Sequence, residues 1–446
     1  MKQIHMRKQL HWLFAALILL TVAATASAQR NREAPAEHTN RMEVFQNEEL
    51  RQDFQIQGEY LADTGSFKMG LHLIADGGGK FRVVSYPDGL PGDGWQAERP
   101  RLLGTAELNG DEIAFNLTEG RGTHAGQNVV MPQNIQTKGK VTIETPQRGQ
   151  GQGGAGQGGG APRPAGAGMF RGNPVKIELP ANGGMPAMTF EKQFRQSPTL
   201  GQEAPGGAVV IFDGTNLDKF QPGARMNEAQ QRQGGGGAQQ RPGAGNTLWA
   251  EAATVAFERK PYKMHLEFML SYMPTARGQA RSNSGVYIDE RYELQVLDSF
   301  GLEGVNDECG GFYQVAAPKV NMCFPPLTWQ TYDIEFTPPQ YDGDRKTVNA
   351  RVTVVHNGVV IHDNLELPQH TPGRRNEGVE PLGVYLQGHG NRVQYRNIWV
   401  QYKDEPTAQA APSQAGVRVA TEEATESQRG RRGAGGQRPL LQRSRQ

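Results

Sequence analysis

Polar and apolar residues alternate along much of the chain, and the stretch RYELQVLDS at residues 291–299 shows this pattern clearly. Tyr292, Leu294 and Val296 fall on one side of the expected strand, whereas Glu293 and Gln295 fall on the other. Strands on the surface of a protein have this pattern, and so do strands that line a binding groove. The alternation therefore predicts a strand and leaves both of these positions open.

The same alternation recurs between residues 205 and 403 in many short runs separated by turn residues. Among them are YKMHLEFMLSY, SGVYIDE, TYDIEFTP, LGVYLQG and VQYRNIWVQY. Asn357-Gly358 stands between two such runs and is a strong signal for a hairpin turn. We expect no helix longer than a turn or two in this unit. The pattern predicts an all-β fold with two packed sheets, as in a sandwich or jelly roll.

A smaller β-rich unit is expected at residues 41–200. GSFKMGLHLIADGGGKFRVVSYPDG contains two alternating runs joined by a glycine-rich turn, and Asn109-Gly110 marks a second turn. Further short runs follow at KGKVTIET, VKIEL and MTFEKQF. These runs predict an antiparallel β-meander. Because it lacks clustered His, Cys or acidic residues, we assign it an accessory role.

Composition marks three segments that interrupt or follow these units. The chain has 446 residues with 57 Gly and 28 Pro, and many of them gather at residues 148–168 and 228–245. Such segments, and the polar tail at residues 404–446, bury too little apolar area to offset the entropy of ordering, so we expect them to be disordered. The net charge of +1 gives no argument for a nucleic-acid partner.

The first 28 residues have the pattern of a secretory signal peptide. Basic residues precede the apolar run HWLFAALILLTVAAT, which ends at the small residues Ala26-Ser27-Ala28. This predicts a periplasmic or secreted protein. No other apolar run approaches the ~20 residues of a transmembrane helix, so we expect no membrane span.

Cys309 and Cys323 are the only cysteines. In an exported protein they could form a disulfide around the segment GGFYQVAAPKVNM or remain two buried thiols. We expect the disulfide, because it would restrain a loop that contains Gly310, Gly311 and Pro318.

Several motifs follow the order found in one family. They are FDGTNLDKF, HLEFMLSY, NSGVYIDERYELQVLD, GGFYQ, WQTYDIEF, HNGVVIHD, LGVYLQGHG and VQYRNIWV. In this order they resemble the 3-keto-disaccharide hydrolase family over residues 205–403. The resemblance implies a concanavalin A-like, laminarinase-like jelly roll, and cleavage of glycosides that are already oxidised to a ketone at C3.

Sugar recognition in such a fold uses polar side chains at alternate positions of neighbouring strands, with an aromatic platform. The candidate substrate-binding residues are Glu267, Asn283, Gln295, Tyr313, Lys319 and Gln387. Each run alone is typical of a solvated face. Together, and with the family's motif order, they favour a groove, so we expect Glu293, Gln295, Asn283, Gln387 and His389 to converge on one face.

Glu293, His389 and Asp298 are the candidate catalytic residues. Gln295 stands where laminarinase-like enzymes carry a second acid, which argues against a retaining mechanism with two paired carboxylates. A 3-keto sugar offers another route, because the ketone makes the C2 proton acidic. Glu293 or His389 could be the base, and Lys319 or Gln387 could stabilise the enolate. Turn or capping roles remain open for His389 and Asp298.

We expect an enzyme, a hydrolase or lyase, whose partner is an oxidised carbohydrate. No cofactor is expected, although a divalent metal held by His389 with Glu293 or Asp298 is an alternative. A non-catalytic lectin and a structural surface protein with a vestigial groove are the competing functions, because one fold can serve many roles.

Overall fold

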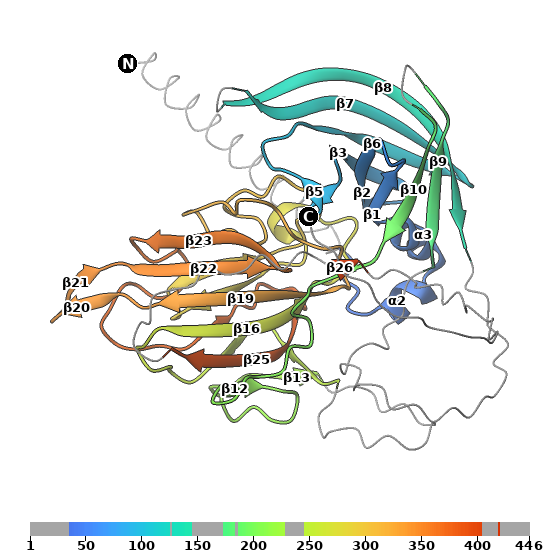
Figure 1. The fold of residues 1–446 in the computed structure, drawn as a ribbon. Helices are drawn as coiled ribbons and strands as arrows, with labels where there is room; N and C mark the ends of the chain where they lie inside the picture. The colour runs from blue at the N-terminus through green and yellow to red at the C-terminus, as the bar shows by residue number, and fades with distance from the viewer. Residues whose placement is uncertain are drawn as a thin grey trace, which may run out of the picture.

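A computed structural model describes residues 35–124, 127–144, 173–182, 186–227, 245–403 and 418–419. The predicted signal peptide and the insert at 148–168 lie outside these residues, as do nearly all of the insert at 228–245 and of the tail at 404–446. The described part forms two β-domains side by side (Figure 1). None of its helices is long and apolar enough to cross a membrane.

The first domain is a closed eight-stranded barrel, so the predicted meander is present and closes on itself. Its antiparallel strands are β1 (Gly58–Asp63), β2 (Lys68–Gly77), β3 (Lys80–Pro87), β6 (Arg101–Asn109), β7 (Glu112–His124), β8 (Gln127–Ile143), β9 (Val175–Leu179) and β10 (Met188–Gln193). The pairing of β1 with β10 completes the ring. Both predicted turns are confirmed, because they join β2 to β3 and β6 to β7.

Two short helices precede the barrel, α2 (Arg41–Gln46) and α3 (Glu48–Ile56). The alternation of polar and apolar residues does not indicate them. Asn40 caps α2 by accepting a hydrogen bond from the backbone N–H of Glu43 at 3.0 Å. Val44 and Ile56 are fully buried and join the hydrophobic core of the barrel. A parallel pair, β4 (Leu90–Pro91) and β5 (Gly94–Trp95), lies in the connection from β3 to β6.

The second domain is a two-sheet sandwich, which confirms the predicted all-β jelly-roll class. The larger sheet contains β12 (Val209–Phe212), β13 (Met226–Asn227), β14 (Thr247–Trp249), β16 (Tyr262–Met269), β19 (Trp329–Thr337), β22 (Ala350–His356), β23 (Val359–Leu367) and β25 (Gln394–Tyr402). The smaller sheet contains β15 (Ala252–Ala253), β17 (Ser284–Ile288), β18 (Tyr292–Val296) and β24 (Tyr385–Leu386). The remaining elements are β11 (Arg195–Gln196), paired with β26 (Arg418–Val419), β20 (Gln340–Asp342), paired with β21 (Arg345–Val348), and the 3-10 turn η1 (Gly278–Ala280).

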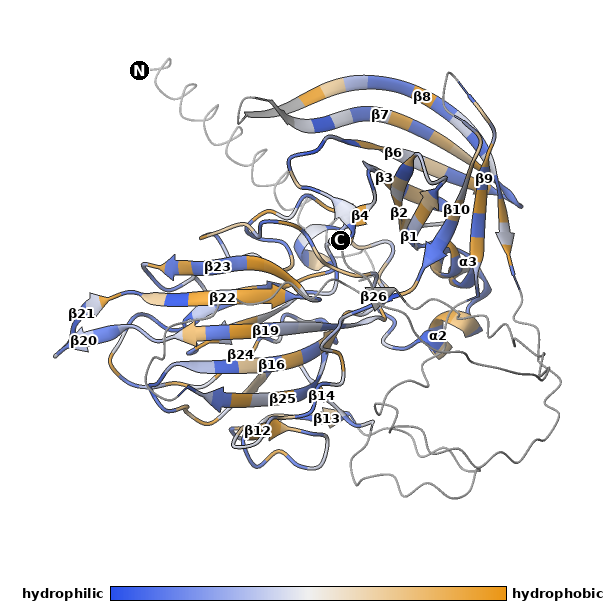
Figure 2. Ribbon diagram, viewed as in Figure 1, coloured by the Kyte–Doolittle hydropathy of each residue, from blue (hydrophilic) through white to orange (hydrophobic). Residues whose placement is uncertain are grey.

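Alternating residues of the two sheets meet in one core, and the alternation of colours along β16, β19 and β22 reflects this (Figure 2). Leu266 and Phe268 of β16 pack in the same cluster as Val286 of β17 and Leu294 of β18. The hairpin expected at Asn357-Gly358 joins β22 to β23, and both residues have positive φ (49° and 84°), as a type I′ turn requires.

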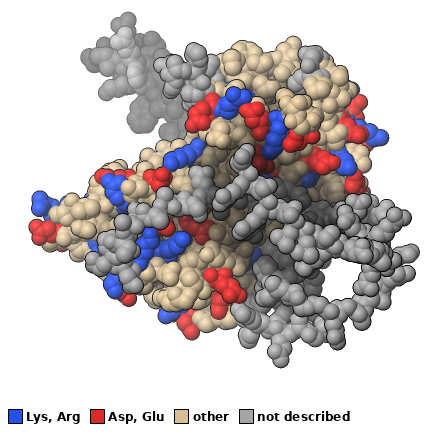
Figure 3. All heavy atoms as spheres, in the orientation of Figure 1, with Lys and Arg blue, Asp and Glu red and all other residues tan. Residues whose placement is uncertain are grey.

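The barrel and the sandwich share part of this core. Leu73 of β2 points into the barrel, whereas Ile74, Val84, Tyr86 and Trp95 on its outside belong to the hydrophobic cluster of the sandwich. Burial of this apolar surface holds the two domains together. On the face shown in Figure 3, acidic and basic side chains are interspersed, in keeping with the net charge of +1.

Candidate active site on the four-stranded sheet

The outer face of the smaller sheet gathers most of the predicted polar residues. Strand β17 pairs with β18 so that Tyr287 lies opposite Glu293 and Gly285 lies opposite Gln295, and Tyr287 also lies opposite Tyr385 of β24. The intervening residues of β18, including Leu294, point into the core between the sheets. The strand phase predicted for RYELQVLDS is therefore confirmed.

Glu293 lies at the centre of this face and is only 3% exposed. The hydroxyl of Tyr287 donates a hydrogen bond to its Oε2 at 2.7 Å. Gly285 leaves room for its side chain, because a Cβ at that position would lie 2.3 Å from Glu293 Oε1. Burial raises the pKa of Glu293 to about 7, although the Tyr287 hydrogen bond opposes this shift. A carboxylate with such a pKa can accept and return a proton near neutral pH.

The segment from Thr371 to Arg374 covers this part of the sheet. The backbone N–H of Glu293 donates to Thr371 Oγ1 at 2.8 Å, and the Tyr287 hydroxyl lies 3.0 Å from the carbonyl oxygen of Pro372. The guanidinium carbon of Arg374 lies 3.6 Å from the centre of the Tyr385 ring. The segment therefore places a cation on the ring of Tyr385, the cross-strand neighbour of Tyr287. Alternation does not indicate this position, because Arg374 lies in a loop.

An amide cluster lies beside Glu293. Gln295 Nε2 is 3.1 Å from Gln279 Oε1 and 3.3 Å from Asn283 Oδ1, and Asn283 Nδ2 is 2.9 Å from Gln279 Oε1. Gln295 Oε1 is buried and has no hydrogen-bond partner within the described residues. Gln279 was not among the sequence candidates, because it lies in the 3-10 turn before β17 rather than on a strand.

Tyr313 and Gln387 lie at the edge of the same face. The backbone N–H of Tyr313 donates to the carbonyl oxygen of Glu293 at 3.1 Å, and Gln387 Nε2 lies 3.5 Å from the Tyr287 hydroxyl. Both side chains are half-buried. Burial raises the pKa of Tyr287, and the nearby Glu293, Tyr313 and Tyr385 raise it further. The structure thus brings together Glu293 with its candidate neighbours on the smaller sheet.

Four other candidates do not join this cluster. Asp298 accepts a hydrogen bond from Arg281 Nε at 2.6 Å in an ion pair whose two side chains are almost completely buried, so its carboxylate is already committed. Lys319 is exposed, and its Nζ lies 3.8 Å from Asp363 Oδ2. It lines a pocket between the two domains. His389 is exposed on the loop after β24, and no hydrogen bond joins it to Glu293.

Glu267 is the fourth, and it lies on the opposite side of the sandwich. On β16 the core residues are Leu266 and Phe268, so Glu267 and His265 point to the outer face of the larger sheet. Glu267 accepts hydrogen bonds from Arg396 Nε and from the backbone N–H of Gly201, both at 2.6 Å. Glu267 therefore does not lie on the face that carries Glu293, because alternation cannot tell which of two sheets a strand joins.

Glu267, His265 and Asp333 form a polar cluster on this outer face. The cluster contacts the segment that links the two domains at Thr199 and Gly201. His265 Nδ1 lies 2.7 Å from Asp333 Oδ1, and the Thr199 hydroxyl donates to Asp333 Oδ2 at 2.7 Å. Burial alone would lower the pKa of His265, but its hydrogen bonds to Asp333 and Glu267 raise it to about 9. His265 is therefore a buried cation between two carboxylates.

We expect this cluster to make stability depend on pH. The pKa of His265 is raised from 6.5 in the unfolded chain to about 9, so its contribution is complete below pH 6.5 and is lost as pH rises through 9. The loss amounts to up to about 3 kcal/mol of unfolding free energy. Urea unfolding at pH 6.5 and 9.5 should show a larger decrease for the natural protein than for His265→Gln. Equal decreases would contradict this assignment, and His389→Gln serves as an exposed control.

The expected disulfide is not present. Cys309 and Cys323 are free and buried, with Cys309 Sγ 3.3 Å from the Tyr332 hydroxyl and Cys323 Sγ 3.5 Å from the carbonyl oxygen of Leu297. Both belong to the sandwich core. The loop between them is instead held by packing and by hydrogen bonds such as that from Asn321 Nδ2 to the carbonyl oxygen of Ser299 at 2.7 Å.

Within the described residues, no group of three or more His, Cys, Asp or Glu side chains could hold a metal ion. The pairs proposed from the sequence, His389 with Glu293 or Asp298, are not joined by any hydrogen bond or ion pair in this part of the chain.

Part of the chain matches the model of a known domain family. Residues 207–401 match the 3-keto-alpha-glucoside-1,2-lyase-like domain. No curated protein matches the chain. Two crystal structures of provisionally assigned glycosyl hydrolases from Parabacteroides distasonis ATCC 8503 are similar, the first at 26% identity and a TM-score of 0.36, covering 45% of this chain and 86% of the other.

The second is 16% identical with a TM-score of 0.28, and it covers 44% of this chain and 94% of the other. A Trypanosoma rangeli sialidase is 9% identical with a TM-score of 0.24 over 77% of this chain and 65% of its own. The family-model match over residues 207–401 includes Glu293 and its neighbours.

Proposed function

We propose that this protein is an exported enzyme that cleaves 3-keto-glycosides by removing the proton at C2 and releasing the substituent at C1. The observation that carries the proposal is the environment of Glu293, a buried carboxylate with a pKa of about 7 on the polar outer face of the smaller sheet. The family supports a carbohydrate-active enzyme. The pattern of the first 28 residues supports export.

Glu293 is the base in this reaction. The C3 ketone acidifies the C2 proton, which moves to the Glu293 carboxylate while the C–H electron pair forms an enolate with its charge on the C3 oxygen. The enolate then re-forms the ketone, a C1–C2 double bond appears, and the C1–O bond breaks. The leaving oxygen takes the proton back from Glu293 or through the Tyr287 hydroxyl, which lies 2.7 Å from Glu293 Oε2. Addition of water to the unsaturated product would complete a hydrolysis.

Arg374 replaces Lys319 as the proposed stabiliser of the enolate. Lys319 lies in the pocket between the domains, whereas the guanidinium of Arg374 lies on the ring of Tyr385. The centre of that ring is 6.0 Å from the centre of the Tyr287 ring. Among the described residues the one ionic partner of Arg374 is Glu290, with Arg374 Nη2 2.8 Å from Glu290 Oε2. Arg375 shares the same carboxylate oxygen. A guanidinium next to the developing negative charge stabilises the transition state more than the ground state.

Purified protein incubated with 3-keto-trehalose, 3-keto-glucosides and their unoxidised parents tests the proposal. We expect the second sugar or the aglycone to be released from the oxidised compounds alone, because the parents lack an acidic C2 proton. Release from the parents at the same rate would contradict the mechanism. Binding of the sugars without release would favour a lectin, for which the amide cluster and Tyr385 also provide suitable groups.

Arg374→Met should lower kcat for a 3-keto-glucoside by about 10- to 100-fold, because the variant keeps the apolar stem over Tyr385 but loses the charge. Arg375→Met is the matched control, since Arg375 follows Arg374 in the chain and shares Glu290 but is 63% exposed. Its kcat should stay within about twofold of the natural protein. Equal losses in the two variants would show that Arg374 acts only through Glu290.

A further inference from the structure

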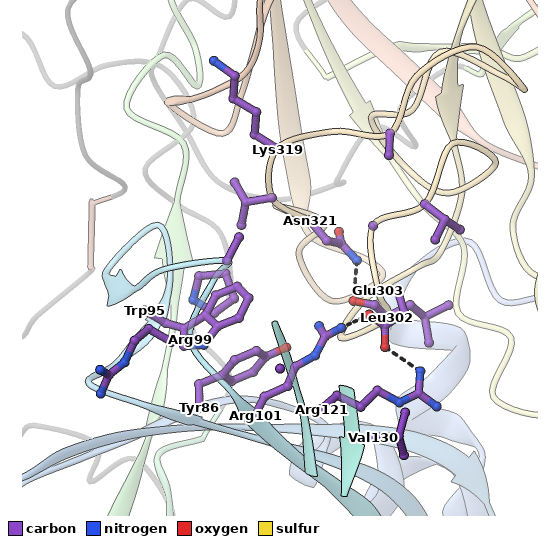
Figure 4. Close-up of a pocket in the computed structure, with 17 residues that line it drawn as sticks. Tyr86, Trp95, Arg99, Arg101, Arg121, Val130, Leu302, Glu303, Lys319 and Asn321 are labelled. Atoms are coloured by element: carbon purple, nitrogen blue, oxygen red, sulfur yellow. Dashed lines mark hydrogen bonds and ion pairs between the residues drawn. The ribbon is translucent and has the colours of Figure 1, made fainter. Parts of the chain in front are cut away.

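A cavity lies between the barrel and the sandwich, away from the outer face that carries Glu293. It has a volume of about 460 Å³ (Figure 4). The barrel contributes Trp95, Arg99, Arg101 and Arg121 to its lining, and the sandwich contributes segments around Glu303 and Asn321. Asn321 Nδ2 donates to the carbonyl oxygen of Leu302 at 3.2 Å, which holds the sandwich side of the cavity in place. The volume suits a sugar of one or two rings.

Basic residues outnumber acidic residues in the lining. Arg99, Arg101, Arg121 and Lys319 are basic, and Glu303 is the one acidic residue among the described lining residues. Figure 4 shows Arg101 and Arg121 converging on Glu303 from the barrel side. Arg121 Nη1 lies 2.6 Å from Glu303 Oε1, and Arg101 contacts Oε2. Arg121 Nε also contacts Glu119, so the two guanidinium groups face two carboxylates, and their remaining N–H groups are the donors for a further anion.

Trp95 adds an unused hydrogen-bond donor and an apolar wall. It is 7% exposed, and its buried indole N–H has no hydrogen-bond partner within the described residues. Its ring packs edge-on against Tyr86, with centroids 5.0 Å apart, and the Arg101 guanidinium lies 5.9 Å from its centre. An unpaired buried donor costs stability unless a ligand completes it. Val130 and Leu302 extend the apolar part of the lining.

We propose that this cavity binds a sugar that carries a carboxylate, that is, a uronate. Its carboxylate would pair with Arg101 and Arg121 beside Glu303, as guanidinium groups bind carboxylates with two hydrogen bonds. The sugar ring would pack on the apolar lining, and a hydroxyl would accept from the Trp95 N–H. The choice of a sugar rests on the proposed carbohydrate function, whereas the preference for a carboxylate rests on the arginines alone.

Binding of glucuronate, measured by isothermal titration calorimetry, tests the proposal with two variants of opposite expected effect. Arg121→Gln removes one cation and should weaken binding about tenfold. Glu303→Gln removes the carboxylate that Arg101 and Arg121 share, while Arg121 keeps its contact with Glu119, and it should tighten binding by a similar factor. Arg351→Gln is the control, because Arg351 is paired with Glu366 on the surface of the sandwich and does not line the cavity. Thermal unfolding of each variant confirms that it is folded.

Glucose, acetate and sulfate separate the possible sources of binding. The proposal expects glucose to bind at least tenfold more weakly than glucuronate, and acetate and sulfate to bind more weakly still. Absence of glucuronate binding to the natural protein, or the same sign of effect in both variants, would overturn it. Binding of acetate or sulfate as tight as that of glucuronate would reduce the cavity to a simple anion site and would also overturn it. Turnover of 3-keto-glucosides is a separate readout, so loss of one function is distinguishable from loss of the other.

Discussion

Glu293→Gln should lower kcat for a 3-keto-glucoside by about 10²- to 10⁴-fold, the usual contribution of a general base. The substitution keeps the size and shape of the side chain, and the Tyr287 hydroxyl can still donate to the amide oxygen. Gly285 leaves the same space beneath it. Loss of turnover in a folded variant would therefore report the missing base rather than a collapsed site. A variant with kcat within fivefold of the natural protein would remove Glu293 from the mechanism.

The pH dependence of kcat/KM of the natural protein should also report the ionisation of Glu293. Burial raises the pKa of Glu293 to about 7, and the base must be ionised to act, so kcat/KM should rise with pH through about 7. Stability should change in the opposite direction. Because the folded pKa is raised above 4.5, the contribution of Glu293 is complete below pH 4.5 and is lost as pH rises through 7.

Glu293→Gln avoids that loss, so the variant should be more stable than the natural protein at pH 8 by up to about 3 kcal/mol, and about equally stable at pH 4.5. Urea unfolding at the two pH values measures the difference. An inactive variant that gains stability above pH 7 is an outcome that a purely structural glutamate would not produce. Glu267→Gln is the contrasting control, because it disrupts the pairing with Arg396 and His265. It should lower stability and leave kcat per folded molecule nearly unchanged.

Local alternation was sufficient to predict the strands and the composition of the Glu293 face. Leu294 and Val296 must be buried, and a strand that buries them turns Glu293 and Gln295 to the other side, whatever the rest of the fold. The same alternation in SGVYIDE puts Tyr287 on the side opposite Val286 and Ile288, and so on this face. The turn residues Asn357-Gly358 fixed a hairpin in the same local way. These predictions hold because they depend on neighbours in the sequence.

The features that local alternation did not predict depend on how distant segments pair. Glu267 shows the expected alternation on β16, but β16 belongs to the larger sheet, so its polar face is covered by the interdomain segment around Gly201. Lys319 and Tyr313 lie six positions apart on one loop, yet only Tyr313 contacts the Glu293 strand. Arg374 lies in a loop without periodicity, so nothing in its local sequence indicated its position over Tyr385. The closure of the barrel likewise depends on the long-range pairing of β1 with β10.

Asp298→Asn should lower the free energy of unfolding by about 3–5 kcal/mol. This variant distinguishes a structural role of the Asp298 carboxylate from a catalytic one. Arg281 is 2% exposed, and Asp298 is its close ionic partner at 2.6 Å. Burial lowers the pKa of Arg281, but the attraction of Asp298 outweighs this effect and raises it. In the variant the guanidinium keeps its charge without that counter-ion. Its remaining acceptors are weak, since the carbonyl oxygens of Ala75 and Pro274 lie 3.4 and 3.5 Å away.

Because Ala75 belongs to barrel strand β2, the same loss should loosen the contact between the domains. Urea unfolding measures the change, and kcat per folded molecule should remain within a few-fold of the natural value. A catalytic Asp298 would give the reverse result, with normal unfolding and lost turnover. The double variant Arg281→Met with Asp298→Leu removes both charges from the core, so it should recover much of the stability lost in Asp298→Asn. A double variant less stable than Asp298→Asn would show that the cost arises from packing rather than from the unpaired arginine.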